Sequence, residues 1–260
     1  MTVAENSADA VQVAPPGKSR EPRVWKFIGT SLWGLVLFGA MFVGQVAVVA
    51  WFLWTSGGEM DGKTLIALSS NGRIISLSVI MGLPAILAAL WVAIRWSRIS
   101  FVDYLALHWP TWRMLVTGIG CLVLLMVGCE VVSHLAGRES SPGFMVDVLK
   151  TARDDGALWL LVLAFCVAAP VTEEFFARGF LYRGWSESFL RPFGAILLSS
   201  AVWTAMPLQY NLFFLGQVFA IGLLFGYLRY RSNSTWLTVI LHGLNNLAAT
   251  VQTIWLANNS

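Results

Sequence analysis

The chain of 260 residues is 57% hydrophobic and only 12% charged, and its mean hydropathy is +0.69. Soluble globular domains are about a quarter charged. Several apolar runs reach about 20 residues, the length that crosses the bilayer core as a helix. A large soluble helical core would need polar faces that these runs lack. We therefore predict an all-α fold, a polytopic transmembrane helical bundle of about seven spans embedded in the lipid bilayer.

The net charge of +3 is small and no long basic run occurs, so the chain is not expected to bind nucleic acid. Residues 1–22 are polar and include two adjacent prolines, which is typical of a disordered segment. The apolar run that follows is too long for the hydrophobic region of a cleavable signal. We predict a disordered cytoplasmic tail over residues 1–24 and a single transmembrane domain over residues 25–260.

The predicted spans follow one another without an internal repeat or a domain boundary. The first and fourth are long enough to tilt, and the fifth and sixth are short and closely joined. We place them at about 27–54, 74–96, 114–135, 157–182, 194–211, 213–230 and 235–257.

The charges between the spans predict the orientation, because cytoplasmic loops carry an excess of lysine and arginine. Basic residues cluster before the first span, between the second and third, after the fourth and at the end of the sixth, and the opposite loops are poorer in net positive charge. The loops 55–73 and 136–156 mix acids and bases. The N-terminus is therefore predicted to be cytoplasmic and, with seven spans, the C-terminus external. The basic residues are Lys18, Arg20, Arg23, Lys26, Arg95, Arg98, Arg113, Arg178, Arg183, Arg191, Arg229 and Arg231.

Two adjacent glutamates, Glu173 and Glu174, interrupt the fourth apolar run. Ionisable residues inside a membrane are costly and therefore mark candidate functional sites. The two side chains point about 100° apart on a helix. Arg178 lies four residues after Glu174 on the same face, so we expect an ion pair there that leaves Glu173 to act as an acid or base. A purely architectural ion-pair cluster is the alternative.

A second polar pair lies in the last span. His242 and Asn246 are four residues apart and share a helix face. Both can donate hydrogen bonds to a developing oxyanion. At about 1.5 Å per residue, His242 lies about 10 Å and Glu173 about 14 Å from the cytoplasmic ends of their helices, so the two groups can meet at similar depth. A histidine that is satisfied by a neighbouring helix is the alternative for this pair.

The order Glu-Glu-x-x-x-Arg, then His-x-x-x-Asn in a final apolar helix, resembles the CPBP family of CAAX prenyl endopeptidases and bacteriocin-processing or self-immunity membrane proteins, also called the Abi family. The resemblance covers about residues 157–250. It implies an intramembrane endopeptidase in the bacterial inner (plasma) membrane that acts on a peptide or protein. Glu173, which activates water, and His242 and Asn246, which stabilise the oxyanion, would be catalytic, and Glu174 and Arg178 would support them.

One motif of the family departs from the pattern. An aromatic residue followed four positions later by histidine is expected between the two motifs, and here Trp203 is followed by Pro207. The missing histidine would help the glutamate to activate water, and proline offers no side-chain donor or acceptor. The loss of such a group typically costs about 10²–10⁴-fold in rate. No three-ligand set with metal-site spacing is visible, so no metal or other cofactor is predicted.

Three functions stay open on the sequence alone. The first is the endopeptidase. The second is a catalytically weakened homologue that binds peptides or serves as a self-immunity or scaffold membrane protein, which Pro207 favours. The third is a transporter or channel lined by Glu130, Glu173 and Glu174, for which the other spans have few polar positions and no half-helix repeat.

Overall fold

A computed structural model describes residues 23–57, 61–138, 143–207 and 209–259. These residues form helices and connecting turns, and no strand occurs among them. The predicted helical membrane bundle is confirmed. The disorder predicted for the tail falls outside the described residues, except for the last two positions of the tail.

The helices are, in chain order, α1 (Phe27–Met41), α2 (Val43–Ser56), α3 (Gly62–Ser69), α4 (Gly72–Ser97), α5 (Phe101–Leu105), α6 (Trp112–Leu135), α7 (Gly143–Asp154), α8 (Leu158–Leu163), the π-helix η1 (Ala164–Ala168), α9 (Ala169–Glu174), the π-helix η2 (Phe175–Leu181), α10 (Tyr182–Ser186), α11 (Arg191–Thr204), α12 (Leu212–Ser232) and α13 (Thr235–Asn259).

Five helical stretches are long and apolar enough to cross a membrane, namely residues 27–55, 72–97, 112–135, 158–186 and 212–232. The predicted fifth span, 194–211, is wrong at its C-terminal end, because α11 ends at Thr204 and Pro207 lies in the turn that follows. The 14 residues of α11 rise only about 21 Å, less than the bilayer core needs. Helix α13 has the length, but its polar side chains keep it out of this set, so the count of seven spans stays a prediction.

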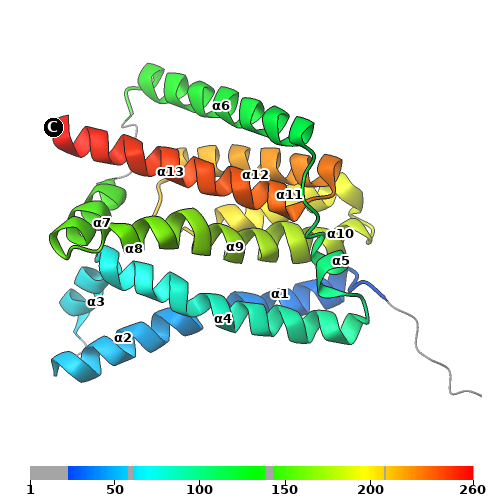
Figure 1. The fold of residues 1–260 in the computed structure, drawn as a ribbon, viewed down its shortest axis with the longest axis horizontal. Coiled ribbons are helices and arrows are strands. Elements are labelled where there is room, and N and C mark those ends of the chain that lie inside the picture. The colour runs from blue at the N-terminus through cyan, green and yellow to red at the C-terminus, as the bar shows by residue number, and fades with distance from the viewer. Residues whose placement is uncertain (1–22, 58–60, 139–142, 208, 260) are drawn as a thin grey trace, which may run out of the picture.

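Helices α8, η1, α9, η2 and α10 form one continuous central segment (Figure 1). Helices α1 and α4 pack on one side of the central segment, and α11, α12 and α13 pack on the other. Helix α6 lies outermost and contacts α12 and α13. The central segment is therefore covered by helices from both halves of the chain, and the largest cluster of buried apolar residues surrounds it.

The N-terminal span has a single-residue break at Phe42, between α1 and α2. The two helices still form one stretch, residues 27–55, which corresponds to the predicted first span. A Cβ atom on Gly44 would lie 2.2 Å from the backbone nitrogen of Gly82. The two glycines therefore allow α2 and α4 to cross with their backbones in contact, as small residues do in membrane helix pairs.

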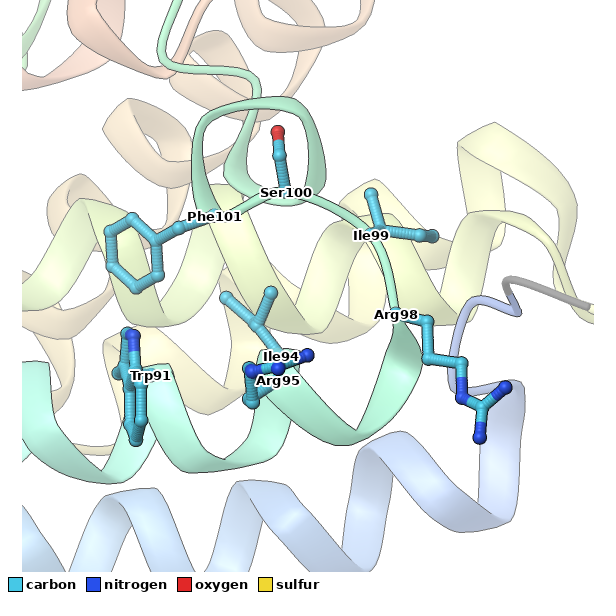
Figure 2. A pocket seen from close by; sticks show the side chains of 7 residues that line it. All are labelled: Trp91, Ile94, Arg95, Arg98, Ile99, Ser100 and Phe101. Atoms are coloured by element: carbon cyan, nitrogen blue, oxygen red, sulfur yellow. The ribbon is translucent and has the colours of Figure 1, made fainter. Parts of the chain in front are cut away.

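The C-terminal turn of α4 and the start of α5 enclose a pocket of about 580 Å³ (Figure 2). Arg98 adopts a left-handed conformation with φ 61° and turns the chain between the two helices. Arg95 and Arg98 line the pocket together with the aromatic rings of Trp91 and Phe101. The pocket lies at the end of a membrane span, away from the two glutamates.

Candidate active site

The two glutamates lie in a single α-helical stretch between two π-helical segments. Helix α9 ends at Glu174, with η1 before it and η2 after it. A π-helical turn holds one more residue than an α-helical turn and often occurs at functional sites. Pro170 in the first turn of α9 contributes to this break, because it has no N–H to donate to the preceding turn.

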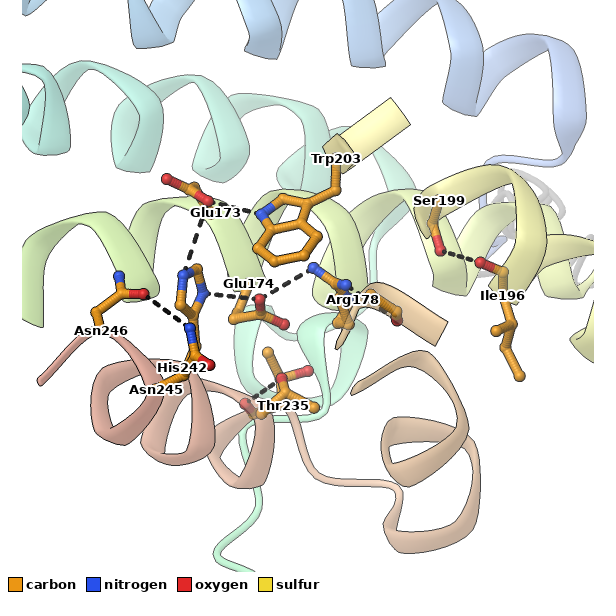
Figure 3. A network of polar contacts seen from close by, with 12 residues as sticks. Glu173, Glu174, Arg178, Ile196, Ser199, Trp203, Thr235, His242, Asn245 and Asn246 are labelled. Carbon is orange, nitrogen blue, oxygen red and sulfur yellow. Dashed lines mark hydrogen bonds and ion pairs between the residues drawn. The ribbon is translucent and has the colours of Figure 1, made fainter. Parts of the chain in front are cut away.

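Glu174 and Arg178 form the predicted ion pair (Figure 3). The Arg178 Nη1 atom lies 3.0 Å from Glu174 Oε1, and neither side chain is exposed. A lone buried charge is strongly unfavourable, whereas a close pair with hydrogen bonds is tolerated. The second carboxylate of the motif is thus held ionised inside the bundle.

Helix α12 and Trp203 complete the surroundings of Arg178. The Nη2 atom donates to the carbonyl of Gly222 at 3.1 Å, and the guanidinium carbon lies 4.5 Å from the centre of the Trp203 ring. A Cβ atom on Gly222 would lie 3.4 Å from Nη2 and 3.2 Å from the Trp203 ring. The glycine therefore provides room for the guanidinium between α12 and the indole.

Glu173 points to another side of the helix, as the 100° offset predicts. Its side chain is 26% exposed, in contrast to Glu174. Its Oε2 atom accepts a hydrogen bond of 2.6 Å from the indole nitrogen of Trp203 and lies 4.0 Å from His242 Nε2. Glu173 is therefore the more exposed carboxylate of the pair, and an indole fixes its orientation.

His242 joins the two glutamates. Its Nδ1 atom lies 3.0 Å from Glu174 Oε1, and the ring stands nearly perpendicular to Trp203, with centroids 5.3 Å apart. An ionised carboxylate only accepts hydrogen bonds, so Nδ1 carries the hydrogen. The bond to Glu174 was not predicted from the sequence, because helical spacing says nothing of which neighbouring helix a side chain meets.

Asn246 lies one turn further along α13 and binds the backbone of the central segment. Its Nδ2 atom donates to the carbonyl of Phe165 at 2.8 Å. Within η1, the backbone N–H of Ala169 donates to the carbonyl five residues earlier, and the next such donor would be residue 170, which is proline. Asn246 thus supplies the donor that Pro170 lacks. Its amide carries two hydrogens, and the second remains for another partner.

Pro207 stands where the histidine of the family pattern is expected. It lies half-buried in the turn after α11, and its carbonyl accepts from the N–H of Tyr210 at 3.2 Å. The sequence singled out Trp203 as the aromatic residue of that motif, but not as a hydrogen-bond donor. The indole N–H was the available signal, since a buried tryptophan normally needs an acceptor.

Within the described part of the chain, no group of three or more histidine, cysteine, aspartate or glutamate residues is arranged to hold a metal ion. That the site works without a metal stays a prediction. What the described residues bring together is a carboxylate–histidine–arginine cluster. The sequence placed Glu173, Glu174, Arg178, His242 and Asn246 in the candidate site, and the structure adds Trp203 and the Phe165 carbonyl.

The fold and this cluster define a class: an integral membrane protein with a glutamate–histidine–arginine cluster inside its helical bundle. Residues 155–248 match a family model described as Type II CAAX prenyl endopeptidase Rce1-like. The match contains all the residues of the cluster and supports the assignment to the CPBP/CAAX protease family that the motifs predicted. No match was found among curated proteins or among solved structures.

Proposed function

We propose that the chain is an intramembrane endopeptidase of the CAAX protease type in which Glu173 activates water. The observation that carries this proposal is the contrast between the two carboxylates. Glu174 is sealed by Arg178, whereas Glu173 is partly exposed, held by Trp203 and 4.0 Å from His242. A carboxylate that is oriented and accessible can accept a proton from water.

In the proposed reaction, Glu173 takes a proton from a water molecule whose oxygen attacks the carbonyl carbon of the scissile peptide bond. The negative charge that develops on the carbonyl oxygen needs nearby donors. When the C–N bond breaks, Glu173 returns the proton to the leaving nitrogen. Atoms and charges balance, and the carboxylate is regenerated as the water is consumed.

His242 can stabilise the oxyanion only in its protonated form. Its Nδ1 hydrogen is directed to Glu174, so Nε2 is an acceptor in the neutral ring and a donor in the imidazolium. We assign the second oxyanion donor to the free amide hydrogen of Asn246.

The substrate is a peptide or protein that reaches the site from the membrane. Loop charges favour a cytoplasmic N-terminus, and the family resemblance favours a bacterial inner membrane. With this orientation, cleavage occurs toward the cytoplasmic side.

The decisive experiment compares purified protein with Glu173→Gln in liposomes that contain a library of membrane-tethered peptides. Glu173→Gln keeps the shape and the acceptor oxygen for Trp203 but cannot take up a proton, so cleavage should fall by about 10²-fold or more. Glu130→Gln, which removes a carboxylate from the outer helix α6, is the matched control and should retain activity. Equal activity of Glu173→Gln and the unmodified protein would refute the proposal.

Pro207 favours a second candidate, a weakened homologue that binds peptides or serves as a self-immunity or scaffold membrane protein. Pro207→His distinguishes the two. It should raise the cleavage rate of an enzyme that has lost one catalytic group. If peptides bind but neither the natural chain nor Pro207→His cleaves them, and if a cellular phenotype survives Glu173→Gln, the binding function is the correct one.

A further inference from the structure

The two oxygen atoms of the Glu173 carboxylate have different surroundings. Oε2 accepts the hydrogen bond of 2.6 Å from the Trp203 indole and lies 4.0 Å from His242 Nε2. Oε1 has neither a hydrogen bond nor an ion pair with any residue that the structure describes. Figure 3 shows Oε1 on the side of the carboxylate that points away from the indole and the imidazole. One oxygen of Glu173 is therefore held by the protein, and the other is left for a reactant.

Trp203 is itself held firmly enough to determine where Oε2 lies. Its side chain is buried, with an exposed fraction of 6%. The Arg178 guanidinium lies over the indole at 4.5 Å, and the His242 ring meets it at an angle of 86°. Arg178 is in turn fixed by its ion pair with Glu174. The orientation of Glu173 thus depends, through one indole, on the buried ion pair behind it.

The turn after α11 does not offer Glu173 a second donor. Pro207 has no polar side-chain atom and no backbone N–H. In the part of this turn that the structure describes, residues 205–207 and 209–211, no group donates a hydrogen bond to Glu173. Trp203, which lies in the last turn of α11, is consequently the residue on which the direction of the carboxylate depends.

We propose that Trp203 is a positioning residue that holds Oε2 of Glu173 and thereby makes Oε1 the atom that takes the proton from water. This inference rests on the proposed function, because it names the base atom of Glu173. An indole N–H only donates, so Trp203 cannot accept the proton itself and acts through the carboxylate. In Glu173→Gln, the side-chain oxygen that remains should face the indole and the amide nitrogen should occupy the place of Oε1.

The test replaces the Trp203 indole with benzothiophene, by incorporation of benzothienylalanine at this position of the full chain. The sulfur atom keeps the shape of the ring and its contact with Arg178 but removes the N–H. Cleavage of a membrane-tethered peptide in liposomes should show kcat lowered about 10²-fold, as for a catalytic group displaced by about 1 Å. KM should be nearly unchanged, because the indole acts on Glu173. Trp203→Phe should lower kcat at least as much.

Trp185 provides the matched control. It is also buried, with an exposed fraction of 5%, and its indole donates to the Ser31 hydroxyl at 3.1 Å, between α10 and α1. Benzothiophene at Trp185 removes a buried indole donor away from the glutamates and should leave kcat nearly unchanged. Equal loss of kcat at both positions would mean a general effect on packing and would overturn the proposal. A raised KM with unchanged kcat at Trp203 would also overturn it, because the indole would then contact the substrate.

A second measurement does not depend on cleavage. The free energies of unfolding of Glu173→Ala, Trp203→Phe and the double variant form a double-mutant cycle. The two losses should not add, because each substitution breaks the same hydrogen bond, and additive losses would overturn the positioning role. If Glu173→Gln is inactive while the benzothiophene variant keeps its kcat, the positioning role is wrong and the proposed function stands. If Glu173→Gln stays fully active, the proposed function fails, and the assignment of Oε1 as the base atom fails with it.

Discussion

Two apolar helices of this protein carry the same local pattern, a glutamate followed four residues later by an ionisable base. In the central segment the pair is Glu174 and Arg178, and in α6 it is Glu130 and His134. In the most apolar 18-residue stretch of the central segment, half of the residues are buried. In the corresponding stretch of α6, 11% are buried. Glu174 is fully buried, whereas Glu130 is exposed and accepts from Gln252 at 3.1 Å.

The difference shows that burial, and not spacing, decides what such a pair does. On a lightly packed outer helix, a hydrogen bond from an amide of a neighbouring helix is enough for a carboxylate. In the centre of the bundle it needs a full countercharge, and that need fixes Arg178, Gly222 and His242 around it. The central pair is therefore expected to control both folding and chemistry, and the outer pair neither.

The largest effect should come from Arg178→Met, which leaves Glu174 buried without its countercharge. Loss of one partner of a buried ion pair costs about 3–5 kcal/mol. Thermal unfolding in detergent should show a strongly lowered midpoint or no folded protein. Adding Glu174→Met to Arg178→Met should restore much of the stability, because two apolar residues remove the unpaired charge. Failure of the double variant to recover would mean that the arginine stabilises the fold through Gly222 and Trp203 instead.

Gly243→Ala should cause the second largest loss of stability. A Cβ atom on this residue would lie 2.6 Å from the carbonyl oxygen of Cys166, so α13 would have to move away from the central segment. Overpacking of this kind costs about 1–3 kcal/mol. The same substitution at Gly128 of α6, where a Cβ atom would meet nothing within 4 Å, is the control. A similar unfolding midpoint for both variants would show that the close approach of α13 is not required.

The same contrast explains what the sequence could and could not predict. The apolar runs and the spacing from Glu174 to Arg178 depend on one helix at a time, and both were predicted correctly. The contact of Trp203 with Glu173 and that of His242 with Glu174 depend on how separate helices meet. The end of α11 was predicted too far along the chain, because apolar residues continue past Thr204. In the structure the helix ends there, and Pro207 lies in the turn that follows.

Asn246→Ala should lower the free energy of unfolding less, by about 1–2 kcal/mol, because it leaves a partly buried acceptor without its hydrogen bond. The acceptor is the Phe165 carbonyl, to which Pro170 has no N–H to donate. The effect of Asn246→Ala should therefore shrink in a Pro170→Ala background, where the backbone donor is restored. Additive losses in this double-mutant cycle would show that Asn246 does not compensate for the proline.

Gln252→Ala should cause the smallest loss of stability. It tests the surroundings of Glu130 on the outer helix α6. It removes the amide that donates to Glu130, and hydrogen bonds between membrane helices average about 0.6 kcal/mol. Because Glu130 is exposed and can find another partner, the unfolding midpoint should shift only slightly and cleavage should be unchanged. A loss as large as that of Arg178→Met would mean that α6 carries an essential polar contact, and that burial does not separate the two pairs.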